Sequence, residues 1–241
     1  GKRINLVDNP STPPTNYVNS YDDYLFHEED NSNLIKSGQI WVGEIFDNTS
    51  SQNFSFSFPN IDLTKPATFE VSAVARAGVT STFTINADNQ PFQLSIGSTV
   101  LSRYEVGFGR ISRQSYTFNP NSNIVNLQLV YNKPQSVAKA WLNYINVNVK
   151  SRLRFIGNQL SFRNIESVGL NNISEFTITH QRPIRVWEVS DNLTIEEKRL
   201  IPVSGGSSFI TATDTLKEFI VPNQSGIFVI FVSENSIISR E

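Results

Sequence analysis

Apolar and polar residues alternate with a period of two over much of this chain, which is the pattern of a half-buried β-strand. In the segment NFSFSFP, Phe54, Phe56 and Phe58 fall on one face of an extended backbone. Ser55 and Ser57 fall on the other face, and a proline ends the segment. Burying one phenylalanine contributes roughly 1.5–3 kcal/mol, so the pattern predicts a strand whose register is strongly fixed.

Similar patterns predict a series of strands that ends near residue 150. They are expected at 68–75, 81–86, 92–96, 104–110, 115–118, 125–131 and 140–150. In the last and longest of these strands, Ile145, Val147 and Val149 share one face. Turn residues such as Lys133 and Pro134 separate the strands.

After Arg154 the pattern restarts with shorter strands, spaced about 8 to 12 residues apart as in a β-sandwich. They are expected at 153–156, 159–163, 174–179, 184–189, 198–203, 208–212, 216–221 and 226–232. Gly205 and Gly206 fit a tight hairpin between two of them. No stretch has helical periodicity over three turns, which disfavours alternating strands and helices around a parallel sheet.

These patterns predict an all-β chain with two consecutive β-sandwich domains. Residues 1–20, which contain three prolines, are expected to form an extended arm. Residues 21–150 are expected to form a jelly-roll-like, galactose-binding-like sandwich. Residues 151–241 are expected to form a smaller, immunoglobulin-like sandwich.

Charge and cysteine content exclude several classes of function. The 20 basic and 22 acidic residues give a net charge of −2, so there is no positive field to attract phosphates and nucleic acid is not an expected partner. The absence of cysteine excludes disulfides, thiolate zinc sites and a cysteine nucleophile within these residues.

No segment has the length of a membrane helix. The longest uninterrupted apolar run, 227–232, falls far short of the roughly 18 to 20 residues that such a helix needs. The first residues, GKR, do not lead into an apolar signal region, and the chain contains no methionine. We therefore expect it to be a fragment of a longer protein.

The segment 22–35 mixes acidic and apolar residues without a clean helical stripe, and it is compatible with a short helical turn that ends at Gly38. His27 stands beside the acidic run from Glu28 to Asp30. These side chains could form a weak cation site, but a charged, solvated surface turn is the favoured interpretation.

The other candidates for chemistry are weak. With only two histidines, a site with three histidine ligands is excluded, and His180 is expected at a strand end. No G-x-S-x-G motif occurs. Glu196 and Glu197 are adjacent, so in a strand they would point to opposite faces and could not flank a glycosidic bond. The segment 107–109, GFG, is interpreted as a bend or bulge. No catalytic, cofactor-binding or metal-binding residue is therefore assigned, no cofactor is expected, and carboxylate pairs distant in sequence stay open.

Aromatic side chains allow a further interpretation, because exposed rings can serve as flat platforms for sugars. Trp41, Trp141 and Trp187 each lie within a strongly apolar strand pattern, for which burial in the core is the default. The alternative platform candidates are Tyr104, Tyr116 and Tyr131.

Six segments occur in a particular order between about Tyr21 and Val232. They are FHEEDNSNLIKSGQIWVGEIF, FEVSAVARAGVTSTFTI, AWLNYINVNVKSRLRF, QLSFRNIESVGLNNISEFTI, RVWEVSD and FIVPNQSGIFVIFV. In this order they resemble the amino-terminal, non-catalytic β region of the PorU family. These proteins are type IX secretion system sortases, gingipain-type cysteine peptidases of the surface of Bacteroidetes. The segments are strand and turn signatures, and none is a catalytic motif.

The resemblance implies a non-catalytic structural and interaction module that positions or docks a downstream catalytic domain of the same polypeptide. The histidine and cysteine pair of that family belongs to the downstream domain, so no catalytic residue carries over to this chain. The parent protein would remove carboxy-terminal sorting domains from secreted cargo and help to attach the cargo to a surface glycolipid. The implied location is the cell surface in association with the outer membrane, with secretion-system proteins or a surface glycan as further partners.

Two alternatives come from the residues themselves. A carbohydrate-binding module would fit the jelly-roll-like first half and the aromatic content of 11%. A hydrolase would require distant carboxylates brought together in an open cleft, about 5 to 10 Å apart.

Overall fold

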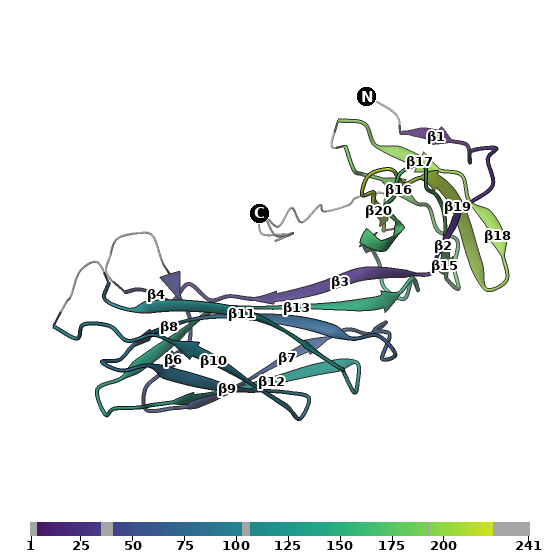
Figure 1. Ribbon diagram of the computed structural model, residues 1–241. Coiled ribbons are helices and arrows are strands. Elements are labelled where there is room, and N and C mark those ends of the chain that lie inside the picture. Colours follow the sequence, from purple (N-terminus) through teal and green to yellow (C-terminus); the bar gives the residue numbers. More distant parts are fainter. Residues whose placement is uncertain (1–3, 35–40, 103–106, 192, 224–241) are drawn as a thin grey trace. The chain divides into compact units, whose positions relative to one another are not determined.

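The computed structural model describes residues 4–34, 41–102, 107–191 and 193–223 (Figure 1). Almost all of the regular structure in these residues is β-strand, and the one helix among them is a 3₁₀ turn, η1 (Ile165–Ser167). The predicted all-β class is confirmed. Within the described ranges, no helix has the length and apolarity needed to cross a membrane.

The chain divides into two compact units. The central unit is continuous in sequence and consists of residues 22–152. The terminal unit combines residues 1–21 with residues 153–241. The division into an arm at 1–20 and sandwich domains at 21–150 and 151–241 stays a prediction.

The central unit is a sandwich of a four-stranded and a five-stranded sheet, accompanied by a separate two-stranded sheet. One sheet has the order β10 (Gln90–Ile96), β9 (Ser81–Ala87), β12 (Ile124–Asn132), β7 (Ser51–Ser57). The other has the order β11 (Arg110–Phe118), β8 (Ala67–Arg76), β13 (Lys139–Arg152), β3 (Ser20–His27). The shorter strands are β6 (Ile45–Phe46), which pairs with β13, and the pair β4 (Ser32–Asn33) and β5 (Trp41–Val42).

An aromatic core fills the space between these two sheets. Phe69 packs with its ring centroid 5.0 Å from Tyr116 and 5.6 Å from Phe118, while Phe83 lies 4.9 Å from Phe46. The predicted alternation in β7 is confirmed, because its phenylalanines are buried in this core and its serines at 55 and 57 are exposed.

A β-bulge in β13 preserves the inward direction of its apolar residues. Leu142 is opposite Ala73 and Tyr144 is opposite Ser72, so Asn143 is the extra residue. The bulge allows Leu142 and the predicted apolar face that begins at Ile145 to enter the same core. The same shift turns Tyr144 away from the core.

The helical turn that the segment 22–35 allowed is not formed. Residues up to His27 are part of β3, and two further residues form β4, whereas Gly38 lies outside the described residues. Pairing with β13 explains the extended conformation. Asp22 forms an ion pair with Lys150, and Ser151 donates a hydrogen bond to Asp23 at 2.9 Å.

Several predicted strands are shorter than expected or lie outside the described residues. The strand predicted at 104–110 is replaced at its described end by a turn, where Gly107 has φ +84°, and β11 begins only at Arg110. The segment 153–156 forms a single bridge, between Arg154 and Thr179. The strand predicted at 226–232 lies outside the described residues.

The terminal unit also has two sheets around a phenylalanine core. One has the order β1 (Asn5–Val7), β17 (Glu196–Lys198), β16 (Trp187–Glu188), β20 (Glu218–Val221), β14 (Leu160–Arg163). The other has the order β18 (Ile201–Val203), β19 (Gly206–Ala212), β15 (Ile173–Thr179), β2 (Asn16–Val18). The core contains Phe162, Phe176, Phe209 and Phe219. The predicted tight hairpin joins β18 to β19, and Gly205 supplies the positive φ of +75° that its turn requires.

Two short strands before residue 20 pair with strands of the terminal unit, although the sequence suggested an extended arm. β1 pairs in parallel with β17, and β2 pairs in parallel with β15. Both strands have three residues, too few for a clear alternation, and the prolines lie between them. The immunoglobulin-like description of this unit stays a prediction.

One buried ion cluster accompanies the apolar core of the terminal unit. Glu188 is only 8% exposed, and it contacts Lys198 Nζ at 2.6 Å and Lys217 Nζ at 2.8 Å. Burial of Glu188 by itself would raise its pKa, but the hydrogen bonds and positive charges of the two lysines outweigh burial and lower the pKa below the ordinary 4.5.

We expect Phe56→Ala to lower the free energy of unfolding by about 3–5 kcal/mol, because it leaves a cavity in the core. Ser57→Ala, on the exposed face of the same strand, should cost less than about 0.5 kcal/mol. Denaturant unfolding of both variants measures the difference, and equal midpoints would contradict the register of β7.

Glu188→Gln should lower the free energy of unfolding by about 3–5 kcal/mol near neutral pH, because it leaves two lysines without their buried counter-charge. Since the folded-state pKa of Glu188 is lowered, its stabilisation is present above pH 4.5 and is lost as the pH falls through the folded-state value. The difference in the free energy of unfolding between wild type and Glu188→Gln should therefore become smaller at acidic pH.

The control is Glu197→Gln, which removes a pair with an arginine that is 57% exposed and should cost less than about 1 kcal/mol. Unfolding curves at several pH values test both statements. A gap for Glu188→Gln that does not change with pH would show that the cluster does not stabilise the fold through its charge.

Candidate functional site

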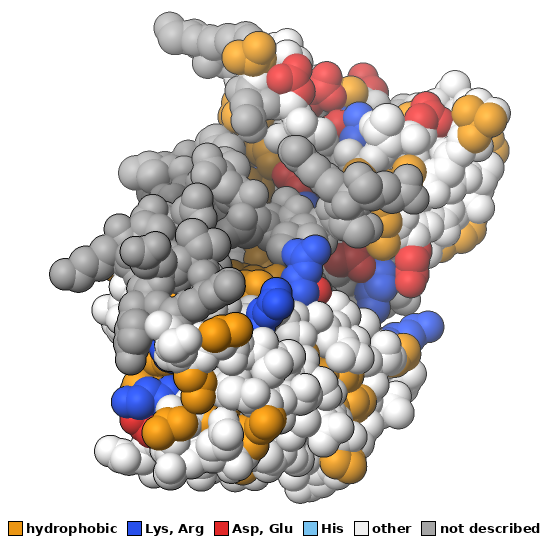
Figure 2. Space-filling model, turned by 60° about the vertical axis from the view of Figure 1, so that its left-hand side comes forward, with side chains coloured by type: hydrophobic (Ala, Val, Ile, Leu, Met, Phe, Trp, Pro, Cys, Tyr) orange, Lys and Arg blue, Asp and Glu red, His pale blue; other side chains and the backbone are white. Residues whose placement is uncertain are grey.

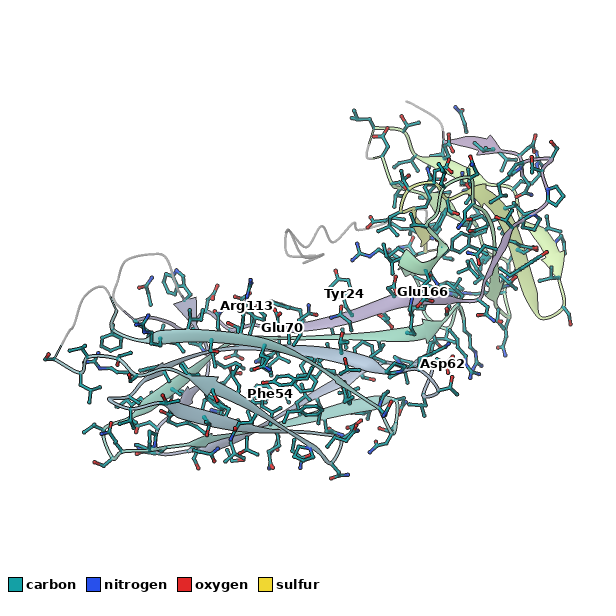
Figure 3. All side chains as sticks on the ribbon, viewed as in Figure 1. Tyr24, Phe54, Asp62, Glu70, Arg113 and Glu166 are labelled. Atoms are coloured by element: carbon teal, nitrogen blue, oxygen red, sulfur yellow. The ribbon has the colours of Figure 1, made fainter. Side chains whose placement is uncertain are left out.

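The outer surface of the sheet β11–β8–β13–β3 combines polar and aromatic side chains. Along β8, Phe69 and Val71 enter the core, so Glu70 between them points outward. Figure 3 shows Glu70, Arg113 and Tyr24 on one side of this sheet and Phe54 on the other, inside the sandwich. We call this surface the polar–aromatic face, and its members are Tyr24, Phe26, Glu70, Arg113, Ser115 and Tyr144.

Glu70 is the centre of the hydrogen bonds on the polar–aromatic face. The Tyr144 hydroxyl donates to Glu70 Oε1 at 2.6 Å, and the Ser115 hydroxyl donates to Oε2 at 2.8 Å. Burial, the hydrogen bond to Glu70 and the negative charge of Glu70 together raise the pKa of Tyr144 to about 12, although Arg113 opposes the shift. Three strands are thus joined by side chains that remain accessible to a partner.

Exposed rings lie beside this network. Phe26 stacks on Tyr144 with ring centroids 5.5 Å apart, and it is 38% exposed. Tyr24, two residues earlier on the same strand, is 39% exposed. Elsewhere the visible surface of the molecule is mostly uncharged, with acidic and basic side chains in scattered groups (Figure 2). Phe26 and Tyr24 thus place exposed rings on the same strand, beside the hydrogen bonds of Glu70.

The aromatic residues selected from the sequence lie elsewhere. The expected burial of Trp141 and Trp187 is confirmed, at 7% and 3% exposed. The expectation for Trp41 is wrong: it is 46% exposed, because in the two-residue strand β5 only Val42 points inward. Tyr131 is buried, Tyr116 is half-buried, and Tyr104 lies outside the described residues.

His27 forms a contact that the sequence did not indicate. Its Nε2 lies 2.6 Å from Glu44 Oε1, and its ring centroid lies 4.9 Å from that of Phe54. Ligand atoms of His27, Glu29 and Glu44 lie within 4.8 Å of one another, a spacing at which these three side chains could hold a divalent cation. A hydrogen bond between the His27 imidazole and the Glu44 carboxylate explains the contact without a metal. Of the predicted neighbours of His27, only Glu29 takes part.

His180 also has a polar partner. Its Nε2 lies 3.0 Å from the Ser207 hydroxyl, which is the contact of a nucleophile with a base. Among the described contacts, no carboxylate orients this histidine, so a catalytic triad is not assembled there.

The carboxylate pair Glu196 and Glu197 is used in ion pairs. Glu196 contacts Lys198 and Glu197 contacts Arg185, consistent with side chains on opposite faces. Four cavities are described in this chain, and at most one carboxylate lines each of them. The geometry expected of a glycoside hydrolase is not found in those four cavities.

Comparison with solved structures supports a known architecture. The chain is similar to dimeric latent PorU from Porphyromonas gingivalis, with a TM-score of 0.73 and 18% identity. The match covers 94% of this chain but 24% of PorU, so the chain spans about a quarter of that protein's length. At this identity the likeness shows the fold, and the resemblance expected from the six segments is confirmed at that level.

Weaker similarities involve modules of about half the length. A CBM36 carbohydrate-binding module, solved with calcium and xylotriose, matches with a TM-score of 0.32, 12% identity, 51% of this chain and 98% of its own. The CBM36-1 domain of a xylanase from the hindgut metagenome of Trinervitermes trinervoides also has a TM-score of 0.32 and 12% identity, over 52% of this chain and 96% of its own. Similarities this weak carry no argument about function. No protein-family profile matches the chain, and no curated protein sequence matches it.

We expect Glu70→Gln to bring the pKa of Tyr144 down from about 12 toward the ordinary 10.0, because the variant removes the negative charge next to the hydroxyl. The measurement is the tyrosinate absorbance of each protein minus that of its Tyr144→Phe variant, over the pH range in which circular dichroism reports a folded chain. Ser115→Ala is the control, because it removes a neutral hydrogen-bond donor but leaves the charge of Glu70. If Glu70→Gln leaves the titration unchanged, the Tyr144–Glu70 contact does not exist in solution.

Proposed function

We propose that this chain is a non-catalytic structural and interaction module of a type IX secretion sortase-like cysteine peptidase, and that it positions or docks the catalytic domain of the same polypeptide. The observation that carries the proposal is the fold match to PorU, which covers nearly all of this chain and a quarter of PorU. The absence of cysteine supports it, because a cysteine peptidase would need its nucleophile in another part of the polypeptide.

The polar–aromatic face is the docking surface in this proposal. Tyrosine, phenylalanine and arginine are enriched at protein interfaces, where aromatic rings supply contact area and arginine supplies directed hydrogen bonds. Tyr24 and Phe26 are exposed on β3, and Arg113 is exposed on β11, at the opposite edge of the same sheet. These residues lie on strands, so their positions are held by the backbone ladder.

The occupant of this face is a further domain of the same chain. A module that corresponds to a quarter of a larger relative must adjoin other parts of that polypeptide. In an intramolecular contact the effective concentration is high, so a face with a few exposed rings is sufficient for docking. Cell-surface location at the outer membrane, and contact with other secretion-system proteins, follow from the resemblance and belong to the same proposal.

A carbohydrate-binding role is the second candidate. The observation that favours it is the stacked pair Phe26 and Tyr144 next to Glu70 and Arg113, since an exposed ring beside hydrogen-bonding groups is a common way to hold a sugar. In that case the loss of the Phe26 ring would weaken binding of a glycan and leave contact with the catalytic domain unchanged. Titration of wild type and Phe26→Ala against a glycan array separates the two roles.

The genomic test is direct. The parent gene is expected to encode a peptidase domain with a histidine and cysteine pair beyond the region that encodes Glu241. Sequencing the gene decides this, and an open reading frame without such a domain would remove the proposal.

We expect the double variant Tyr24→Ala, Arg113→Glu to weaken binding of this chain to the separately expressed catalytic domain by roughly 10- to 100-fold, because it removes a ring and reverses a charge on the docking surface. Calorimetric titration measures the effect. The matched control, Thr84→Ala with Gln128→Glu, changes two exposed residues on the outer surface of the other sheet. Equal dissociation constants for the two double variants would show that docking does not use the polar–aromatic face.

A further inference from the structure

A basic cavity in the terminal unit has no role in the docking described above. Its volume is about 810 Å³, and it is formed by the segments 154–158 and 179–182 together with the turn at Gly205. The backbone joins these segments, because Phe155 N donates to Thr179 O at 2.8 Å and His180 N donates to Gly205 O at 3.2 Å. The cavity is therefore built into the pairing of the strands.

The ionisable side chains that line this cavity are all basic. Arg154, His180 and Arg182 line the cavity, and no aspartate or glutamate does. A concave surface lined by one sign of charge concentrates ligands of the opposite sign.

Arg182 differs from several arginines of the same unit. Arg163, Arg185 and Arg199 each form an ion pair with a carboxylate. Arg182 instead donates to the backbone carbonyl of Gly157, and its guanidinium lies 4.9 Å from the ring centroid of Phe155. These contacts orient the guanidinium at the cavity wall without neutralising its charge.

The remaining lining residues indicate which neutral groups a ligand of this cavity should carry. Asn158, Thr179 and Gln181 contribute amide and hydroxyl groups, which suit a ligand with several hydroxyls. Phe155 is buried and its ring is covered by Arg182, so the cavity offers hydrogen bonds and charge in place of an aromatic platform. The volume lies in the range of pockets that bind small organic molecules, about 300–1,000 Å³, and exceeds the needs of a single inorganic ion.

We propose that this cavity binds a hydroxylated organic anion of about monosaccharide size, an acidic sugar whose carboxylate or phosphate contacts Arg154 and Arg182. His180 is a positioning residue at the wall, because its Nε2 is held by Ser207 at 3.0 Å. This activity is separate from docking of the catalytic domain and uses no residue of the polar–aromatic face.

The two histidines of the chain make a sharp experiment available. His180 lines the cavity and His27 belongs to the central unit, so their imidazole NMR signals serve as reporter and internal control. The probes are glucuronate, glucose 1-phosphate, glucose and inorganic phosphate, each titrated to about 10 mM. We expect glucuronate or glucose 1-phosphate to shift the signals of His180 in a saturable way and to leave those of His27 in place. The stronger of the two identifies the anionic group.

Variants test the arginines. Arg154→Gln and Arg182→Gln should each weaken binding of the stronger probe by about tenfold or more, because a charge-assisted hydrogen bond is lost. Arg199→Gln, which changes an exposed arginine of the same unit paired with Asp8, should leave affinity unchanged. Because Arg182 contacts Gly157 and Arg154 also has contacts of its own, both variants are interpreted only with an unchanged melting temperature, and the probe titrations of the unaltered chain supply the test in either case.

Four results would overturn the proposal. The first is that glucose binds as tightly as the stronger anionic probe, which would make the charge irrelevant. The second is that inorganic phosphate binds as tightly as that probe, which would reduce the cavity to an unspecific anion site. The third is that no probe shifts the signals of His180, and the fourth is that Arg154→Gln leaves the affinity unchanged.

Discussion

The pairing of β8 with β13 determines which side chains of the central unit reach the core and which reach its surface. The two strands are in register from Arg76 opposite Lys139 to Thr68 opposite Asn148, with one shift at the bulge. Because side chains alternate across a strand, a slip of one residue would exchange the two faces completely. Phe69 would then point to solvent and Glu70 into an aromatic core. Burial of the core thus fixes the surface as well.

That constraint explains why a polar network can persist on an open sheet. Glu70, Ser115 and Tyr144 come from three neighbouring strands, and backbone hydrogen bonds hold all three. Little side-chain entropy must be lost to bring them together, since each strand already places its residue. The terminal unit uses a different arrangement, in which Glu188 and Lys198 are buried, Lys217 is half-buried, and the ion pairs stabilise the unit from within. The same types of residue therefore have different roles in the two units because their burial differs.

The sequence predicted the long strands well because their evidence is local. The alternation around Phe56 and the aliphatic face at Ile145 are visible within a few residues, and both are found in the structure. The segment 22–35 could not be assigned in the same way, because its strand is specified by a partner more than a hundred residues away. For that reason Phe26 was not recognised as a neighbour of Tyr144.

Site residues that are distant in sequence but adjacent in the structure show the same limit of prediction from local sequence. His27 and Glu44 are 17 residues apart and no short motif links them, and the basic cavity combines three segments with no shared pattern. Trp41 was misplaced for a related reason, since an apolar neighbourhood in sequence does not reveal that a two-residue strand has one face in solvent.

The pairing of β2 with β15 bears on the order in which the chain can fold as it is synthesised. Asn16 is aligned with Ser174, so the terminal unit needs residues from both sides of the central unit and cannot be completed until most of the chain has been made. The central unit is continuous and can form earlier. Its edge strand β3 and its neighbour β13 are adjacent in one sheet, so once it has folded, the chain enters and leaves it at nearby points. Asn19 and Leu153, which are joined by a backbone hydrogen bond of 2.8 Å, are then close together before the terminal unit forms. Folding of the central unit therefore already meets the entropic cost of closing a loop of more than a hundred residues. The terminal unit can then form from segments that are close in space.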